Sequence, residues 1–343
     1  MNIRMQPSNA PTFVDQFARH KHKLRISVTD RCNFKCLYCM PEHPQWTSKK
    51  QLLSWDELYQ FCDFMVRRGI EQIRITGGEP LLRHGVVHFV EKLQSLRAYG
   101  LKRISMTSNA HYLKTHAVAL KQAGLDDLNI SLDSLDPIQF KQLTQKDLAP
   151  VIEGIAAAQA AGLKIKINTV LIQGLNDNQI LPLAHWSIQQ QVLLRFIEFM
   201  PLDGDQKWSR QQVVSEQEML NQLSQDFKLD QLRQTGADPA RHYQINGHPI
   251  AIISTITHSF CDRCDRIRLT ATGELYHCLF ATQGLNIKAE IQQLHQLNVQ
   301  QEQALTQSIA TYIWHKKAGY AAIQQTQRAE QSIRKISMHM LGG

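Results

Sequence analysis

The sequence of 343 residues predicts an α/β fold, a partial (β/α)6 barrel of the TIM type whose open side is closed by a smaller C-terminal β-containing module. Short β-branched segments alternate with longer amphipathic ones from residue 23 to about residue 200. Such units in series indicate a parallel sheet with helices outside it. Six strands are fewer than the eight of a closed barrel, so we expect the barrel to stay open on one side.

The elements of the barrel follow from residue type and periodicity. The expected strands are rich in β-branched residues and comprise Leu24–Val28, Gln72–Thr76, Arg103–Thr107, Leu128–Leu132, Lys164–Leu171 and Leu193–Phe199. The expected helices have apolar residues at helical spacing. They comprise Trp55–Arg68, Val86–Ala98, Ala110–Ala123, Val151–Ala161 and Asn176–Gln190. Ligands of such barrels bind where the strands end, and we expect the functional site there.

The pattern changes after Met200, where a loop, a helix over Glu216–Asp226 and a turn-rich linker are expected. Short alternating segments then predict a small β-containing module, and a glutamine-rich stretch from residue 291 to 327 has helical periodicity. We therefore divide the chain into an N-terminal lead-in (1–22), the barrel (23–233) and the C-terminal module (234–343).

Three cysteines, Cys32-x3-Cys36-x2-Cys39, fall within eight residues directly after the first expected strand. Zinc sites usually close a tetrahedron of four ligands, and this first triad has no fourth cysteine nearby. Three thiolates on a four-iron cluster leave one iron without a protein ligand. The spacing therefore favours a 4Fe-4S cluster with one iron open to a substrate, over structural zinc or a disulfide.

A second triad, Cys261-x2-Cys264-x13-Cys278, lies in the C-terminal module. A single Cys-x2-Cys pair could be a zinc knuckle or a redox pair, but two triads in one chain favour a second cluster. The non-enzymatic alternative is a zinc-stabilised binding protein, with His258 or His277 completing this site. The seventh cysteine, Cys62, lies among apolar residues at helical spacing, and we expect it to be a small buried side chain.

Composition limits the location and the partners. Residues 1–16 have no apolar signal-peptide core, and no segment has the roughly 18 apolar residues needed to cross a bilayer. We expect a cytoplasmic protein, in which thiols stay free for metals. The net charge of +8 favours an anionic partner, either nucleic acid or a phosphorylated small molecule. The basic run Arg19–Lys23 is most simply a solvated lead-in to the first strand.

Several segments carry a resemblance to a known family. The first triad, with Tyr38 before its last cysteine and Gly77-Gly78-Glu79-Pro80 after the second strand, resembles the radical S-adenosylmethionine superfamily. Further segments extend the resemblance over residues 24–343 to the GTP 3′,8-cyclase family of molybdenum cofactor biosynthesis. They are residues 129–136, 195–200 and 260–269 and the terminal Gly342-Gly343.

The resemblance implies ligands position by position, with one 4Fe-4S cluster on each triad. S-adenosylmethionine would contact Tyr38, Gly78, Ser131 and Met200. GTP would contact Arg25, Arg74, Thr107, Lys166, Arg266 and Arg268, with Arg195 as a neighbour. The residues with implied catalytic roles are Arg266, Arg268, Gly342 and Gly343. Spacing also supports the pair Arg266 and Arg268, because alternate residues of a strand point to one face.

The implied reaction is that of a lyase-type GTP 3′,8-cyclase. A 5′-deoxyadenosyl radical from S-adenosylmethionine would remove the C3′ hydrogen of GTP, and C3′ would bond to guanine C8 to give 3′,8-cyclo-7,8-dihydro-GTP. The implied partners are an electron donor such as a flavodoxin or ferredoxin system and, through the pathway, a downstream cyclic pyranopterin monophosphate synthase. We expect no nucleic acid and no membrane partner, and a homodimer stays open.

The chain departs from the family pattern at one motif. The family commonly has Thr-Thr-Asn-Gly where this chain has Thr107-Ser108-Asn109-Ala110. Alanine allows the turn if φ stays negative, and we expect only a local shift. The alternative function is a radical S-adenosylmethionine enzyme with an auxiliary cluster that acts on tRNA or a peptide. The pair Arg266 and Arg268 beside the second triad favours a small phosphorylated substrate instead.

Overall fold

The computed structural model describes residues 13–202, 208–233, 236–329 and 336–342, and its strands form one twelve-stranded sheet. The middle of this sheet consists of six parallel strands in chain order. They are β1 (Lys23–Ser27), β2 (Gln72–Thr76), β3 (Arg103–Ser108), β4 (Asp127–Ser131), β5 (Lys164–Leu171) and β6 (Leu193–Glu198). Each strand agrees with its predicted bounds to within one residue at either end.

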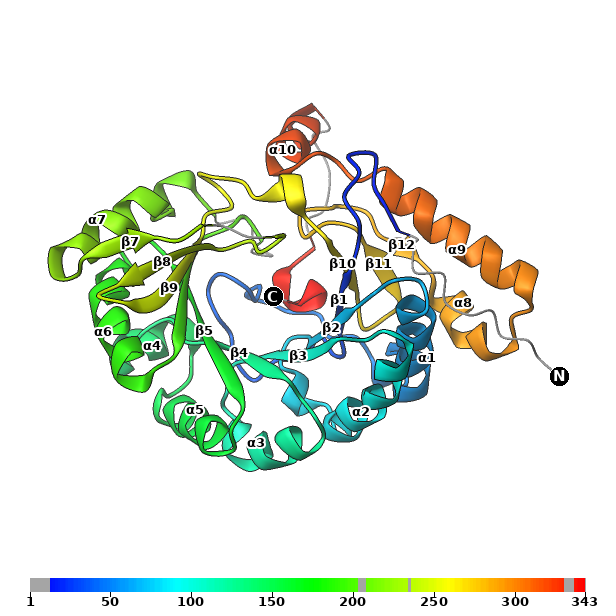
Figure 1. Ribbon diagram of the computed structural model, residues 1–343, viewed down its shortest axis with the longest axis horizontal. Coiled ribbons are helices and arrows are strands. Elements are labelled where there is room, and N and C mark those ends of the chain that lie inside the picture. Colours follow the sequence, from blue (N-terminus) through cyan, green and yellow to red (C-terminus); the bar gives the residue numbers. More distant parts are fainter. Residues whose placement is uncertain (1–12, 203–207, 234–235, 330–335, 343) are drawn as a thin grey trace.

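Helices cover the outer side of these strands and form a ring around them (Figure 1). They are α1 (Trp55–Val66), α2 (Val86–Leu93), α3 (Leu113–Gln122), α4 (Pro137–Thr144), α5 (Ala149–Ala160) and α6 (Ile180–Gln190). Helix α4 was not predicted from the sequence. Its start has a local signal, since Asp136 accepts hydrogen bonds from the backbone N–H groups of Ile138 and Gln139, and Pro137 occupies the first turn.

Later strands extend both edges of the partial barrel. Parallel to β1 lies β10 (Arg266–Leu269), followed outward by β11 (Glu274–Tyr276) and β12 (Leu285–Asn286). Parallel to β6 lies β9 (His248–Ile253), followed by β8 (Arg241–Ile245) and β7 (Leu229–Gln231). The sheet stays open in the described part of the chain, as expected for a partial barrel. The division at residue 233 falls between β7 and β8, which pair with each other, and it stays a proposal.

The remaining helices are α7 (Glu216–Asp226), α8 (Lys288–Gln293), α9 (Val299–Trp314), α10 (Tyr320–Ala329) and α11 (Met338–Leu341). The short helix α11, red in Figure 1, lies inside the ring of strands. The helices α8, α9 and α10 divide the glutamine-rich stretch. Gly319 lies between α9 and α10, where a Cβ atom would lie 2.8 Å from the Cβ atom of Cys261. This connection therefore packs directly on the second triad.

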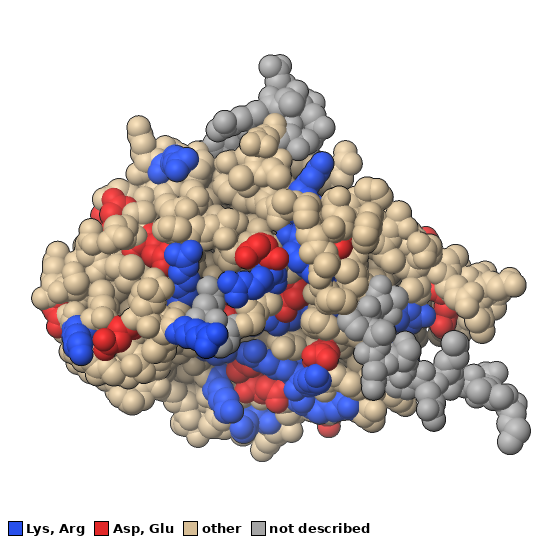
Figure 2. All heavy atoms as spheres, turned by 45° about the horizontal axis from the view of Figure 1, so that its top comes forward, with Lys and Arg blue, Asp and Glu red and all other residues tan. Residues whose placement is uncertain are grey.

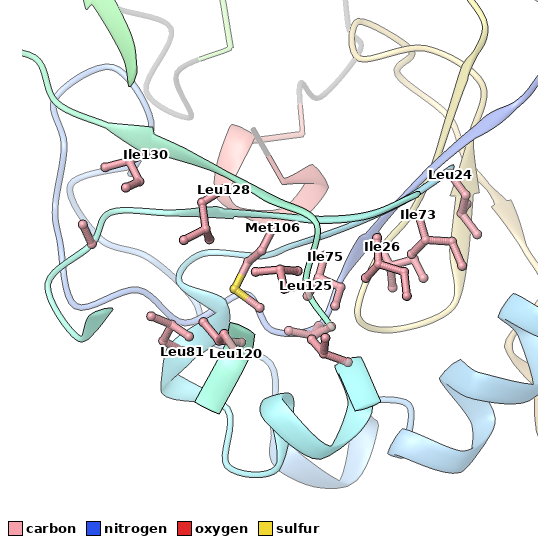
Figure 3. Close-up of a cluster of buried hydrophobic side chains, with 14 of the residues drawn as sticks. Leu24, Ile26, Ile73, Ile75, Leu81, Met106, Leu120, Leu125, Leu128 and Ile130 are labelled. Carbon is pink, nitrogen blue, oxygen red and sulfur yellow. The ribbon is translucent and has the colours of Figure 1, made fainter. Parts of the chain in front are cut away.

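The outward side chains of the strands form the hydrophobic core with the helices. In Figure 3 the side chain of Met106 points toward Leu120, while Ile73 lies beside Ile26 and Ile75 lies beside Leu125. Each of the three strand residues is fully buried. Cys62 in α1 is also fully buried within this core, which confirms its expected structural role. Among the described residues, no helix has the length and apolar character that crossing a membrane requires.

Candidate active site

A central cavity inside the barrel is lined by both cysteine triads and by inward side chains of β1, β2, β3, β5, β6 and β10. It includes the predicted S-adenosylmethionine contacts Tyr38, Gly78, Ser131 and Met200. It also includes the predicted GTP contacts Arg25, Arg74, Thr107, Lys166, Arg195, Arg266 and Arg268. Figure 2 shows Lys and Arg side chains gathered toward the middle of the face that it draws, with acidic side chains among them.

The cationic lining of the cavity comes from strand periodicity, because alternate residues of a strand point to one face. Arg25 of β1 lies opposite Arg74 of β2 and Arg268 of β10 in the strand register. Burial and the neighbouring guanidinium groups lower the pKa of Arg25 well below its ordinary value. Burial likewise lowers the pKa of Lys166 to about 8, with Arg103 adding to the effect. An anion with several charges would relieve this repulsion.

The same periodicity reveals cavity residues that the sequence analysis missed. Arg103 and Ser105 precede Thr107 at alternate positions of β3, and Asn168 follows Lys166 on β5. Arg103 donates to both carboxylate oxygens of Asp127, at 2.5 and 2.6 Å. Polar residues at alternate positions of otherwise apolar strands were the signal that could have identified them.

Close backbone packing places the first triad next to the end of β2. The N–H of Gly78 donates to the carbonyl of Thr29 at 2.8 Å, and the N–H of Glu79 donates to that of Arg31 at 2.8 Å. A Cβ atom on Gly78 would lie 2.3 Å from the carbonyl oxygen of Arg31, so only glycine fits there. This contact fixes the loop that carries Cys32.

Two buried carboxyl groups accompany the first triad. Asp133 accepts a hydrogen bond from the Tyr38 hydroxyl at 2.7 Å, and burial raises its pKa to about 6. Glu79 accepts from the N–H of Asn109 at 2.7 Å, and burial raises its pKa to about 7. Burial, then Asp133 and the neighbouring thiols, raise the pKa of the Cys36 thiol well above its ordinary value. Iron must therefore displace protons from these thiols.

The second triad has cationic surroundings. Lys316 is 2% exposed and its Nζ donates to the Sγ of Cys264 at 3.1 Å. Burial raises the pKa of the Cys264 thiol, but Arg266 and Lys316 outweigh it and bring the value to about 5.

The expectation of a solvated basic run over Arg19–Lys23 is wrong, since Arg19 is 6% exposed and Lys21 is fully buried.

The donor chemistry of both triads fits a 4Fe-4S cluster. All seven cysteines are free thiols. In the described ranges, no three His, Cys, Asp or Glu side chains are close enough to share a single metal ion. A cluster does not require this, because each cysteine binds a different iron. Both histidines of the zinc alternative have other contacts. The Nδ1 of His258 lies 3.1 Å from a carboxylate oxygen of Glu216, and the ring of His277 stacks on Tyr312.

The C-terminal tail enters the barrel. The guanidinium of Arg268 donates to the carbonyl of Gly342, and to that of Leu341 at 3.4 Å. A Cβ atom on Gly342 would overlap the Oγ1 of Thr76, so this position accepts only glycine. Gly343, the last predicted catalytic position, lies outside the described residues.

The condition of a negative φ at Ala110 is not met, because its φ is +64°, in the left-handed region that disfavours alanine. Its conformation is fixed by neighbours. The N–H of Ala110 donates to the Oγ of Ser108 at 3.0 Å, and this hydroxyl donates to Glu79 at 3.0 Å. Its carbonyl oxygen packs so closely on α5 that a Cβ atom on Gly154 would lie 2.1 Å away.

Comparisons with known proteins agree with this geometry. A family model described as the Radical SAM superfamily matches residues 26–187, and one described as Molybdenum Cofactor Synthesis C matches residues 192–322. A GTP 3′,8-cyclase of Streptomyces coelicolor is 41% identical over 318 residues, covering 90% of this chain and 91% of the relative. One of Brucella ovis is 35% identical over 349 residues, covering 100% and 99%. The chain belongs to the GTP 3′,8-cyclase family.

Membership of the GTP 3′,8-cyclase family makes the chain an enzyme of molybdenum cofactor biosynthesis that uses 4Fe-4S clusters and S-adenosylmethionine. Solved structures share the fold at low identity. The crystal structure of Streptococcus suis SuiB bound to precursor peptide SuiA superposes with a TM-score of 0.61 at 13% identity. It covers 85% of this chain and 68% of that chain. The likeness supports the partial barrel of the GTP 3′,8-cyclase family.

Proposed function

We propose that this chain catalyses the lyase-type cyclisation of GTP to 3′,8-cyclo-7,8-dihydro-GTP, the first step of molybdenum cofactor biosynthesis. The observation that carries the proposal is the central cavity, which brings both triads and a layer of cations together. A substrate held by its anionic end between two metal centres would fit this arrangement. Relatives of the chain carry the name GTP 3′,8-cyclase, which agrees with it.

The triphosphate would bind the inward cations of the strands. Arg25, Arg74 and Lys166 are crowded by like charges, which a triphosphate would neutralise. Arg195 donates to the Oδ1 of Asn129, so its guanidinium is oriented by a partner on β4. The Thr107 hydroxyl supplies a neutral contact on the same lining.

S-adenosylmethionine would bind beside the first triad, held by Cys32, Cys36 and Cys39. Bound to this cluster, S-adenosylmethionine would supply the radical chemistry that removes the C3′ hydrogen of GTP. The chain positions the cofactor through the close backbone at Gly78 and the side chains of Ser131 and Met200 at the strand ends. Tyr38 is fixed beside it, because its hydroxyl donates to Asp133.

The guanine base would lie toward the second triad, where Cys261, Cys264 and Cys278 would hold the other cluster. Arg266 and Arg268 alternate on β10 and line the cavity beside these cysteines. Arg268 also holds the tail at Gly342, so one guanidinium links the base-binding side to the chain end. With α11 inside the barrel, the tail, including Gly343, would exclude water during the bond formation between C3′ and C8.

The surroundings of the reaction follow as part of the proposal. An electron donor such as a flavodoxin or ferredoxin system would reduce the first cluster, and cyclic pyranopterin monophosphate synthase would consume the product. We place the protein in the cytoplasm, where its seven free cysteines would stay reduced.

The deciding experiment uses anaerobically reconstituted protein with S-adenosylmethionine, dithionite and GTP deuterated at C3′. We expect about eight irons per chain from two four-iron clusters and deuterium in the 5′-deoxyadenosine that forms. Eight irons without deuterium transfer would move the substrate elsewhere, toward the tRNA or peptide alternative. Zinc in place of iron would exclude the whole proposal.

A further inference from the structure

The N-terminal segment just before β1 contains a buried ion cluster that the proposed reaction does not use. Asp15 and Lys21 are fully buried and Arg19 is 6% exposed. The Nε of Arg19 and the Nζ of Lys21 each lie 2.7 Å from the same carboxylate oxygen of Asp15. One carboxylate thus orients two cations, and burying such charges is costly unless they are paired and hydrogen-bonded.

The two cations use their remaining donors on the loop of the second triad. Arg19 donates through Nη1 to the carbonyl of Cys261 at 2.6 Å, and Lys21 donates to that of Cys264 at 2.8 Å. Arg19 also donates to the carbonyls of Ala318 at 2.6 Å and Lys317 at 2.9 Å. The charged group of Asp15, Arg19 and Lys21, which we call the Asp15 cluster, therefore joins two of the three cysteines to the connection between α9 and α10.

That connection brings a third cation to the sulfur itself. Lys316 is buried, and its Nζ donates to the Sγ of Cys264 at 3.1 Å and to the carbonyl of Arg266 at 3.4 Å. The close packing of Gly319 on Cys261 fixes the distance between this connection and the triad. The backbone that carries Lys316 thus cannot move away from the triad unless the contacts of Arg19 with residues 317 and 318 are also broken.

We propose that Asp15, Arg19 and Lys21 hold the loop of the second triad in the geometry that retains its cluster, and that Lys316 raises the reduction potential of this cluster. The proposal rests on the 4Fe-4S cluster assigned to this triad. Reduction adds one negative charge, so an ammonium group beside a ligating sulfur stabilises the reduced form more than the oxidised form. Hydrogen bonds to the sulfurs act in the same direction.

Lys316 is tested in the full-length chain with Cys32, Cys36 and Cys39 replaced by alanine, so that the second cluster is the sole iron centre. The midpoint potential is measured by redox titration followed by electron paramagnetic resonance. We expect Lys316→Met to lower the ratio of reduced to oxidised cluster about tenfold at a fixed potential, a shift of about 59 mV. Lys316→Arg should keep the potential near that of the parent chain.

The matched control is Lys317→Met, which removes the same charge at the adjacent, exposed position. An unchanged potential in Lys316→Met, or an equal shift in both variants, would overturn the assignment of Lys316. Iron loss from Lys316→Met alone would make Lys316 a residue of cluster retention and overturn its effect on potential. Absence of iron in the parent triple variant would instead overturn the cluster assignment, which separates the two failures.

The Asp15 cluster is tested by the rate at which a chelator removes iron. In the same triple variant, Arg19→Gln should lose iron several-fold faster, because the carbonyls of Cys261 and Ala318 lose their shared donor. In the chain with an intact first triad and with Cys261, Cys264 and Cys278 replaced, Arg19→Gln should leave the rate unchanged. His20→Gln, at the adjacent exposed position, is the control. Equal rates for both variants, or equal acceleration at both triads, would overturn the proposal.

Discussion

The two cysteine triads have the same donor set and opposite electrostatic surroundings. The first lies near the buried carboxyl groups of Asp133 and Glu79, whose pKa values burial raises to about 6 and about 7. At the second, Arg266 and Lys316 outweigh the effect of burial and lower the pKa of the Cys264 thiol to about 5. The two triads differ in spacing, so the set of three thiolates defines the type of metal centre, while the surrounding charges define its properties.

The different surrounding charges would give the two clusters different reduction potentials and different roles. A cluster beside buried carboxyl groups would be harder to reduce than one among cations, and it would be the stronger reductant that cleavage of S-adenosylmethionine needs. A cluster among cations is easier to reduce and lies where the anionic substrate would bind.

The largest effect should come from removing one cysteine of each triad. We expect Cys36→Ala and Cys264→Ala both to abolish cyclisation of GTP and to lose about four irons per chain. Only Cys36→Ala should also abolish any cleavage of S-adenosylmethionine that is measured without GTP. Iron analysis and chromatography of 5′-deoxyadenosine measure this. If Cys264→Ala loses cleavage equally, the two centres do not act separately.

Arg268→Ala should lower kcat/KM for GTP by about 10²-fold to 10³-fold, because loss of a buried charged contact costs about 3–4 kcal/mol. The same variant should speed hydrogen exchange of residues 336–342, since Arg268 donates to the carbonyls of Leu341 and Gly342. Arg263→Ala is the control, because this side chain lies near the same triad but is 53% exposed. An equal loss of kcat/KM in both variants would show that only the net charge of the chain matters.

The stability of the chain should depend on pH through Glu79, the buried carboxyl group near the first triad. Burial raises the pKa of Glu79 from its ordinary value of 4.5 to about 7, so the folded chain keeps a proton that the unfolded chain releases. This contribution to the free energy of unfolding is complete below about pH 4.5 and is lost as the pH rises through 7. Its size is about 3 kcal/mol.

Urea unfolding of the iron-free protein at pH 5 and pH 8 measures the effect of Glu79. The parent chain should lose stability between these values, and Glu79→Gln should lose about 2 kcal/mol less. Glu153→Gln, at an exposed carboxylate, should behave as the parent does. The same pH dependence in Glu79→Gln and the parent would show that Glu79 does not cause it.

The smallest effect should come from two alanines with positive φ, one near each triad. Ala110 has a φ of +64° beside Asn109, and Ala18 has a φ of +58° beside Arg19. Replacing either by glycine should raise the free energy of unfolding by about 1 kcal/mol, because glycine adopts this conformation without strain. Ala156→Gly, at an exposed position of α5, should lower it by about as much. Thermal unfolding checks the sign at each site.

Local signals were sufficient for the barrel strands. The six central strands agree with prediction to within one residue, because β-branched runs between turn residues are a local property. The strands β7, β11 and β12 were missed, since each has at most three residues and depends on pairing with a neighbour. Nor could the sequence show that β9 and β10 extend opposite edges of one sheet, because pairing is decided between distant segments.

The sequence by itself determined the donor sets of both centres and much of the cavity lining. Cysteine spacing is preserved in any fold of the loop, and alternate strand positions such as Arg266 and Arg268 must share a face. The close backbone contact of Gly78 could also be predicted from its motif, because such a contact requires a residue without a side chain.

Only the tertiary structure decided the surroundings of those centres. Arg19 and Lys21 belong to a charged run that is typical of a solvated segment, and their partners Cys261 and Cys264 lie more than 240 residues away. The positive φ of Ala110 likewise depends on Ser108, Glu79 and the packing of α5. The burial and pairing of charged side chains and the strain of the backbone depend on neighbours in space, and the order of residues along the chain does not reveal those neighbours.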